Sequence, residues 1–329
     1  YKVGWNLNSN GVAERWDNSY IEVGGVGWEG AGAGVAIANL DGDSRPDMVL
    51  MAYDNPSEAN SFRYKVGWNL DGNGIANRWD NSYIEVGGVG WEGAGAGVAI
   101  ANLDGNSRPE MVLMAYDNPA QANSFRYKVG WNLNSNGVAE RWDNSYIEVG
   151  GVGWEGAGAG VAIANLDGDS RPDMVLMAYD NPSEANSFRY KVGWNLNSNG
   201  VAERWDNGYV EVEGVGWEGQ GAGIAIVNLD EHSRPEMILM AYDNPSEANS
   251  FRYKVGWNLN NNGVANRWDN SYVEVGGVGW EGAGAGVAIA NLDDLTRPEM
   301  VLMAYDNPSE ANTFRYKVLR NLNDNGVAT

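Results

Sequence analysis

Residues 1–16 read YKVGWNLNSNGVAERW, and near-copies of this stretch begin at Tyr64, Tyr127, Tyr190, Tyr253 and Tyr316. Each step is 63 residues, so the chain of 329 residues holds five complete repeats and a remainder of fourteen. An unbroken period of this length indicates one assembly of equivalent units rather than several unrelated domains. The repeat presents any surface site up to five times, which suits multivalent binding better than catalysis.

The composition excludes several classes of partner. The net charge is −22, from 44 acidic and 22 basic side chains, so the surface would repel nucleic acid. No run approaches the roughly 18 apolar residues of a membrane span, and we expect no membrane insertion. Cysteine is absent, which excludes disulfides and thiol chemistry. The chain begins with Tyr1 and shows no signal peptide, so we expect a processed chain or a fragment.

Each repeat predicts four short strands separated by polar turns. The strands are expected at residues 34–40 (GVAIANL), 48–54 (MVLMAYD), 64–70 (YKVGWNL) and 83–86 (YIEV). The second is apolar on both faces, which indicates burial, and the fourth carries Glu85, which indicates a sheet edge. The GAGAG stretch at 30–34 is interpreted as a tight crossing between units. Four antiparallel strands with a charged outer edge are typical of a β-propeller blade. A stacked solenoid is the alternative, but its units usually span about 20–30 residues.

The predicted fold is therefore all-β: a single five-bladed β-propeller over residues 1–329, with four-stranded antiparallel blades. We expect blades at about 31–93, 94–156, 157–219 and 220–282, and a last blade at 283–329 completed by residues 1–30. The N-terminal strand at 20–23 would close the ring and remove the unpaired sheet edges. Residues 1–14 and 316–329 then compete for one third-strand place. Arg320 and Leu319 replace the usual Trp and Gly in the second of these segments, and the sequence leaves the choice open.

The turn between the first two strands, NLDGDSRPD, resembles a cation-binding loop. Side-chain oxygens recur at Asn39, Asp41, Asp43 and Asp47, and the Arg45 carbonyl can add a further ligand. Hard cations such as Ca²⁺ prefer an oxygen cage of this kind, so a structural calcium ion is one interpretation. The alternative is a set of Asx turns that need no ion.

The same segment resembles the FG-GAP, or VCBS, repeat of integrin-type propellers. The matching pieces are GAGVAIANL, DGDSRPD and MVLMAYDN, which recur with changes in all five copies and cover most of the chain. Proteins of this type include integrin heads, toxin and adhesin modules, and fungal propeller lectins that bind amino sugars. Many have seven blades, so a count of five is a departure from the family.

The copies differ at the loop positions that would bind a cation. The central oxygen of Asp43 and Asp169 is replaced by Asn106, His232 and Leu295 in the other copies, and the last Asp becomes Glu. We therefore expect metal only in copies one and three. The predicted set is Asn39, Asp41, Asp43, Arg45, Asp47, Asn165, Asp167, Asp169, Arg171 and Asp173.

A sugar site is predicted on the face where the second-to-third and fourth-to-first loops emerge. Sugars are held by an aromatic plate and by carboxylate or amide groups, and these loops carry both. The predicted ligand-binding residues are Trp28, Glu29, Asp54, Asn55, Trp91, Glu92, Asp117, Asn118, Trp154, Glu155, Asp180, Asn181, Trp217, Glu218, Asp243, Asn244, Trp280, Glu281, Asp306 and Asn307. Alternatively, the tryptophans pack between blades and the Asp-Asn-Pro segments are simple turns. The opposite face offers a second candidate of the same chemistry at Arg15, Trp16, Asp17 and Asn18.

Enzyme interpretations lack the residues they need. The chain has a single histidine, His232, and no G-x-S-x-G or phosphate-binding glycine motif. A carboxylate pair such as Glu29 with Asp54 is the remaining catalytic possibility, as a glycosidase. We expect a secreted, extracellular, non-catalytic lectin that binds glycans or glycoproteins at repeated sites. The alternatives are a protein-interaction or adhesion propeller, and a fragment of a larger secreted toxin or surface protein.

Overall fold

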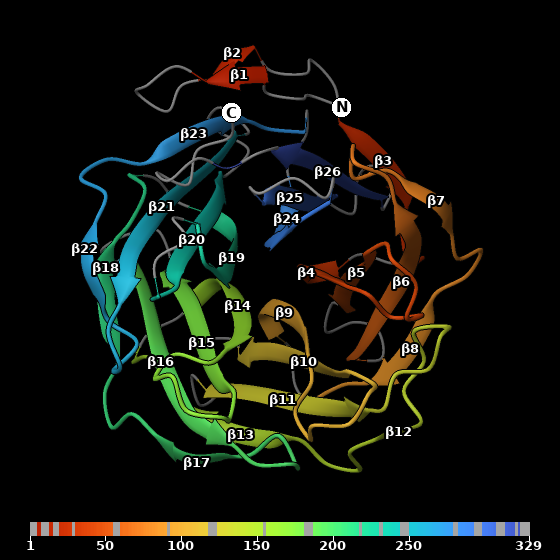
Figure 1. Cartoon of the computed structure of the whole chain (residues 1–329), viewed down its shortest axis with the longest axis horizontal. Coiled ribbons are helices and arrows are strands. Elements are labelled where there is room, and N and C mark those ends of the chain that lie inside the picture. The colour runs from red at the N-terminus through yellow and green to blue at the C-terminus, as the bar shows by residue number, and fades with distance from the viewer. Residues whose placement is uncertain are drawn as a thin grey trace.

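The apolar runs of each repeat form strands, and the strands form five sheets that stand around one axis as the blades of a propeller (Figure 1). The computed structural model describes residues 5–7, 13–15, 20–27, 30–54, 60–90, 93–117, 124–153, 156–180, 187–216, 219–229, 233–243, 250–278, 282–292, 298–306, 313–319 and 322. Within these ranges every regular element is a strand. The predicted fold class and the number of blades are confirmed.

Blade one shows the arrangement that the others repeat. It comprises β4 (Gly30–Ala38), β5 (Asp47–Asp54), β6 (Ser61–Leu70), β7 (Ala76–Trp79) and β8 (Ile84–Gly87). The strands are antiparallel in the order β4-β5-β6-β7, and β8 also pairs with β6.

Blades two to four have the same order of strands. Blade two contains β9 (Gly93–Ala101), β10 (Glu110–Asp117), β11 (Ser124–Trp131), β12 (Arg141–Trp142) and β13 (Ile147–Gly150). Blade three contains β14 (Gly156–Ala164), β15 (Asp173–Asp180), β16 (Ser187–Leu196), β17 (Ala202–Trp205) and β18 (Val210–Glu213). Blade four contains β19 (Gly219–Val227), β20 (Glu236–Asp243), β21 (Ser250–Leu259), β22 (Ala265–Trp268) and β23 (Val273–Gly276).

The innermost strands explain the glycine-rich sequence and correct one prediction. The first strand begins at Gly30 and not at residue 34, so GAGAG is the start of a strand rather than a crossing between blades. A Cβ atom on Gly32 would lie 2.6 Å from the amide nitrogen of Ala96 in the next blade. Equivalent contacts run around the ring and end with Gly284 against Ala33. Backbones can approach this closely only where the side chain is a hydrogen atom.

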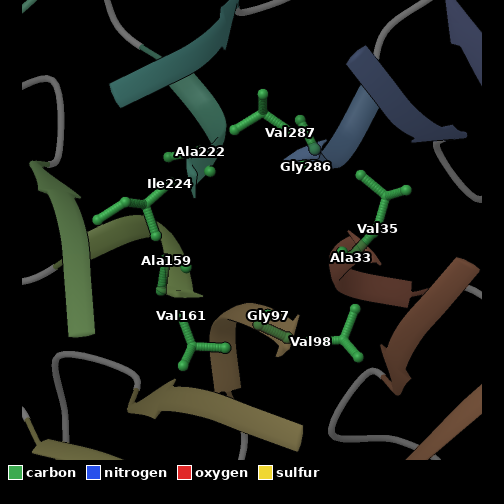
Figure 2. A pocket seen from close by; sticks show the side chains of 15 residues that line it. Ala33, Val35, Gly97, Val98, Ala159, Val161, Ala222, Ile224, Gly286 and Val287 are labelled. Atoms are coloured by element: carbon green, nitrogen blue, oxygen red, sulfur yellow. The ribbon is translucent and has the colours of Figure 1, made fainter. Parts of the chain in front are cut away.

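The inner strands surround a narrow central hollow lined by residues 33–35 and their counterparts in the other blades. Val35, Val98, Val161, Ile224 and Val287, one from each blade, extend from the inner strands into the spaces between neighbouring blades (Figure 2). Alternation along the strand therefore puts Gly32 and Gly34 against the backbone of one neighbouring blade and Val35 against the core of the other.

The core lies between blades rather than within them. Residues 48–53 of β5 are completely buried, because one face of the strand packs on each neighbouring blade. One hydrophobic cluster joins Met51 and Tyr53 of blade one to Val98 and Leu113 of blade two. Burial of each such side chain contributes about 1.5–3 kcal/mol, so the contact between blades is the main stabilising element.

The third and fourth strand positions differ in detail from the prediction. The third strand begins at Ser61, three residues earlier than expected. The fourth position is filled by two short strands, because β7 pairs with the end of β6 and β8 with its beginning. The ring of Trp79 in β7 covers Gly67, where a Cβ atom would lie 2.7 Å from the indole. The sequence pattern predicts a loop for this segment, and that prediction is wrong for residues 76–79.

Blade five is built from both ends of the described chain. It comprises β24 (Gly282–Ala290), β25 (Glu299–Asp306), β26 (Thr313–Leu319) and β3 (Ile21–Gly24). The strand β3 pairs with the first half of β26, in the register Phe314↔Val23 and Tyr316↔Ile21. Closure by the N-terminal strand is therefore confirmed, and residues from the C-terminal segment take the third-strand place.

The competing N-terminal segment forms a sheet of its own. The strands β1 (Trp5–Leu7) and β2 (Ala13–Arg15) pair with each other through Trp5↔Arg15 and Leu7↔Ala13. This is the register of β6 with β7, in which Trp68 pairs with Arg78 and Leu70 with Ala76. The segment thus keeps the hairpin that its sequence specifies.

Among the described residues, no helix is long and apolar enough to cross a membrane.

Candidate binding sites at the blade boundaries

Strand register brings the predicted sugar-binding segments together at one end of every blade. Gly30, which follows Trp28 and Glu29 in sequence, pairs with Asp54 at the end of β5. The same pairing recurs at Gly93↔Asp117, Gly156↔Asp180, Gly219↔Asp243 and Gly282↔Asp306. At the same end, Ser61 pairs with Gly87, so the fourth-to-first and second-to-third loops share one face. That part of the prediction is confirmed.

Most of the predicted ligand-binding residues themselves lie outside the described residues. This holds for the five Trp-Glu pairs and for the Asn that follows each Asp. Asp54 and its copies end the second strands, and only their backbone position is described. The assignment of these side chains to a site therefore stays a prediction.

A repeated polar network that sequence reasoning missed lies next to this face. In blade one, the Arg63 guanidinium lies over the Tyr83 ring, 4.2 Å from its centroid. Its Nε and Nη2 atoms donate to Oε2 of Glu85 at 3.0 and 2.9 Å, and Nη1 donates to the Val26 carbonyl at 3.1 Å. Ser61 Oγ donates to the other Glu85 oxygen at 3.0 Å.

The Arg, Tyr and Glu contacts of this network recur at all five blade boundaries, whereas, in the described part of the chain, the hydroxyl bond to Glu recurs in four and is absent at Thr313. The equivalent Arg, Tyr and Glu residues are Arg126, Tyr146 and Glu148; Arg189, Tyr209 and Glu211; Arg252, Tyr272 and Glu274; and Arg315, Tyr20 and Glu22. Each copy of S/T-F-R and of Y-I/V-E carries the residues in sequence. Recognising them as partners requires the register of β6 with β8, which strand patterns alone do not give.

The second candidate, on the opposite face, has a structural role where it is described. Asp80, equivalent to Asp17, accepts a hydrogen bond from the Trp68 indole nitrogen at 2.9 Å. Arg78 lies over the Trp68 ring, 4.7 Å from its centroid, and Trp79 covers Gly67. These residues therefore hold a buried tryptophan in place. Trp16, Asp17 and Asn18 lie outside the described residues, and the side chain of Arg15 is not described.

The loops predicted to bind calcium are held by their own hydrogen bonds. The Asn39 side chain accepts from Gly42 N at 2.7 Å and donates to the Asp43 carbonyl, while Asp43 Oδ1 accepts from Arg45 N at 2.6 Å. With the amide orientation that satisfies its neighbours, Asn195 donates to Asp169 in copy three at 2.7 Å. No three acidic or histidine side chains among the described residues are grouped as a metal site requires. The described geometry is that of Asx turns, and calcium stays a prediction of the sequence.

The last acidic residue of the loop points into the blade. Asp47 is fully buried, and its carboxylate accepts hydrogen bonds from the backbone amides of Leu40 and Asn69, both at 2.8 Å. Burial raises the pKa of this carboxyl, and the two hydrogen bonds oppose the rise. Glu110 makes the same pair of contacts with Leu103 and Asn132. The exchange of Asp for Glu therefore keeps the hydrogen bonds that join the loop to the third strand.

His232 and Leu295 lie outside the described residues.

Comparison with known proteins gives no family for the chain. No protein-family profile and no curated protein matches its sequence. Among solved structures, AofleA from Arthrobotrys oligospora aligns with 92% of this chain and 87% of its own length, at 10% identity and a TM-score of 0.47. An exo-β-1,3-galactanase from Phanerochaete chrysosporium, solved with β-1,3-galactotriose, aligns with 92% of this chain and 64% of its own, at 12% identity and a TM-score of 0.47. These scores support no conclusion about function, and the FG-GAP resemblance stays a prediction.

Proposed function

We propose that this propeller binds carbohydrate without catalysing a reaction, at equivalent sites repeated around one face. The observation that carries the proposal is the register that joins Gly30 to Asp54 in blade one and recurs in every blade. In sequence, a Trp-Glu pair immediately precedes each of these glycines and an Asn immediately follows each Asp. An aromatic plate beside carboxylate and amide groups is the combination that holds a sugar ring by its C–H face and its hydroxyls.

Repetition supports binding rather than turnover. Five sites on one rigid ring bind a surface coated with sugars more tightly than one site does, because every further contact is intramolecular. A glycosidase needs one well-formed pair of carboxylates at a defined separation, and gains nothing from five similar sites. The proposed residues are the five Trp-Glu and Asp-Asn pairs, with glycans or glycoproteins as partners. We also propose that the protein acts outside the cell.

A glycan array probed with the fluorescently tagged chain tests this function. We expect binding to a defined set of glycans, competition by the free sugar, and no release of reducing sugar from bound oligosaccharides over prolonged incubation. Replacing the five Trp28-equivalent residues with Ala should abolish array binding, while replacing the described core residue Phe188 with Leu should not. Silence across amino sugars, fucose, galactose and mannose would overturn the proposal and favour a protein-interaction propeller. Steady release of reducing sugar would instead identify an enzyme.

A further inference from the structure

The large hydrophobic side chains that remain exposed belong almost entirely to one repeated position. Among the described residues, five large hydrophobic side chains are exposed, and four of them are Tyr83 (37%), Tyr146 (36%), Tyr209 (42%) and Tyr272 (37%). The fifth copy of this position is Tyr20, which is partly buried. An exposed aromatic ring at the same place in four blades is unusual in a chain whose other described aromatic rings are buried or half-buried.

These rings are held rigidly by the network beneath them. The Arg63 guanidinium lies 4.2 Å from the centroid of Tyr83, and its own position is fixed by Glu85 and by the Val26 carbonyl. The Arg63 side chain is only 16% exposed, so these interactions are shielded from solvent. A ring held in this way loses little conformational freedom when a ligand stacks on it.

Each ring lies at the junction of two blades. Tyr83 and Glu85 belong to blade one, whereas Val26 and Gly27 follow β3 of blade five. A Cβ atom on Gly27 would lie 3.6 Å from the Tyr83 ring, which places this glycine beside its edge. The next residue along the chain is Trp28, the predicted aromatic residue of the sugar site.

From this geometry we infer that Tyr83 and its four copies are a second sugar-stacking plate at each blade boundary. The inference rests on the proposed function and adds Tyr83 and Glu85, which belong to the same blade as Asp54, to the site. The ligand is a neutral or amino pyranose with an apolar C–H face, which packs on the ring while its hydroxyls donate to Glu85. The Glu85 side chain is 41% exposed and carries a negative charge, and the whole chain carries −22, so an acidic sugar is disfavoured.

Binding measurements on three variants distinguish this inference from a purely structural role. The probes are the methyl glycosides of N-acetylglucosamine, galactose, mannose and fucose, titrated calorimetrically into the full chain. In the first variant, all five tyrosines (Tyr20, Tyr83, Tyr146, Tyr209 and Tyr272) become Ser. In the second, the same five become Phe, which keeps the ring and its stack on arginine. In the third, the five Trp28-equivalent residues become Ala.

We expect the Ser variant to bind at least about tenfold more weakly than the parent, and the Phe variant within about threefold of it. A folded Ser variant with the parent's Kd would overturn the inference while the proposed function stands, provided that the Trp variant loses binding. A parent chain that binds none of the four probes would overturn both.

A single substitution provides the test if the fivefold Ser variant does not fold. Tyr146→Ser alters one boundary and leaves four unchanged, so the number of sites per chain should fall by one. The matched control is Tyr127→Phe, which changes a buried tyrosine of the same blade and should leave the number of sites unchanged. An unchanged number of sites in Tyr146→Ser would overturn the inference.

Discussion

Blades one to four are each made from one continuous segment, whereas blade five joins residues 21–24 to residues 282–319. The contacts at this seam nevertheless match those of the other blades. Arg315 pairs with Glu22 at 2.8 Å, as Arg63 does with Glu85 at 2.9 Å. The Tyr316 hydroxyl donates to the Gly74 carbonyl at 3.0 Å, as Tyr64 does to Gly137 at 2.9 Å.

One difference between the two kinds of blade lies at the glycine position of the third strand. In blades one to four it is glycine, and the ring of a fourth-strand tryptophan covers it. In blade five it is Leu319, which is fully buried. We predict that the larger side chain occupies the space that the Trp79 ring occupies in blade one. The first half of the third strand is therefore fixed by contacts between blades, whereas its second half tolerates two kinds of packing.

Removing the seam strand should have the largest effect. Deletion of residues 1–24 removes β3, so the Val23 side chain no longer packs in the core and Arg315 loses Glu22. We expect a loss of about 4 kcal/mol or more in the free energy of unfolding, measured by urea denaturation. Deletion of residues 1–19 is the matched control, because β1 and β2 pair only with each other, and it should cost less than about 1 kcal/mol. Equal unfolding midpoints for the two deletions would contradict this role of β3.

Giving blade one the leucine that blade five has in its third strand should have the next largest effect. Gly67→Leu places a side chain where the Trp79 ring lies, and we expect it to cost about 2–3 kcal/mol. Adding Trp79→Ala should recover part of this loss, because the pair then resembles blade five. The measurement is a double-mutant cycle of unfolding free energies. Additive costs would show that Leu319 and Trp79 are not alternative fillings of one space.

The buried tyrosines should make the continuous blades sensitive to alkali. Burial raises the pKa of Tyr64, Tyr127 and Tyr190, and each hydroxyl donates to a carbonyl of the following blade. The unfolded chain ionises these groups near pH 10, while the folded protein keeps them protonated. Their contribution is therefore complete below pH 10 and is lost above it, by about 1.4 kcal/mol per pH unit for each tyrosine.

Urea midpoints measured from pH 8 to 11 test this dependence (the pH range brackets the free tyrosine pKa of about 10). Tyr127→Phe removes one ionising group and should reduce the steepness above pH 10, at the cost of one hydrogen bond at neutral pH. A midpoint that does not fall in alkali would contradict the assigned cause.

Calcium should have the smallest effect on the free energy of unfolding, since the side-chain oxygens in the loops of copies one and three already accept hydrogen bonds from amides of the same loops. If a cation binds there, millimolar Ca²⁺ should stabilise the chain by about 1 kcal/mol, and chelator should reverse the gain. The double variant Asp43→Asn with Asp169→Asn copies the residue present at Asn106 and should lose the response. No shift in the unfolding midpoint would identify the loops as Asx turns without metal.

The repeat alone was enough to predict five blades, a buried second strand and closure by both ends of the chain. Those features follow from the repeat period and the pattern of apolar residues, and both can be read directly from the sequence. The split fourth position was missed because residues 71–83 are mostly polar, and Trp79 packs on a glycine only when β6 and β7 are paired. The same holds for the Arg63–Glu85 pair, whose members are neighbours only in the register of β8.

The choice between the two third-strand segments depended on packing. The sequence marked Leu319 as a poor match to the repeat, whereas in the structure that residue fills the seam. The sequence was enough to predict that the second-to-third and fourth-to-first loops share one face, because strand order determines this, while the sugar site assigned to that face stays a prediction. The proximity of Tyr83 to Gly27 depends on how adjacent blades meet, and no pattern within one repeat predicts that contact.

The glycine contacts between the inner strands also limit the number of 63-residue repeats that the ring can hold. Five inner strands meet backbone to backbone only at one circumference, and a sixth 63-residue copy would force them apart. The gap so opened faces residues without side chains, which cannot fill it. Duplication of one more unit would therefore require new residues at Gly32 and its counterparts before the enlarged protein could close.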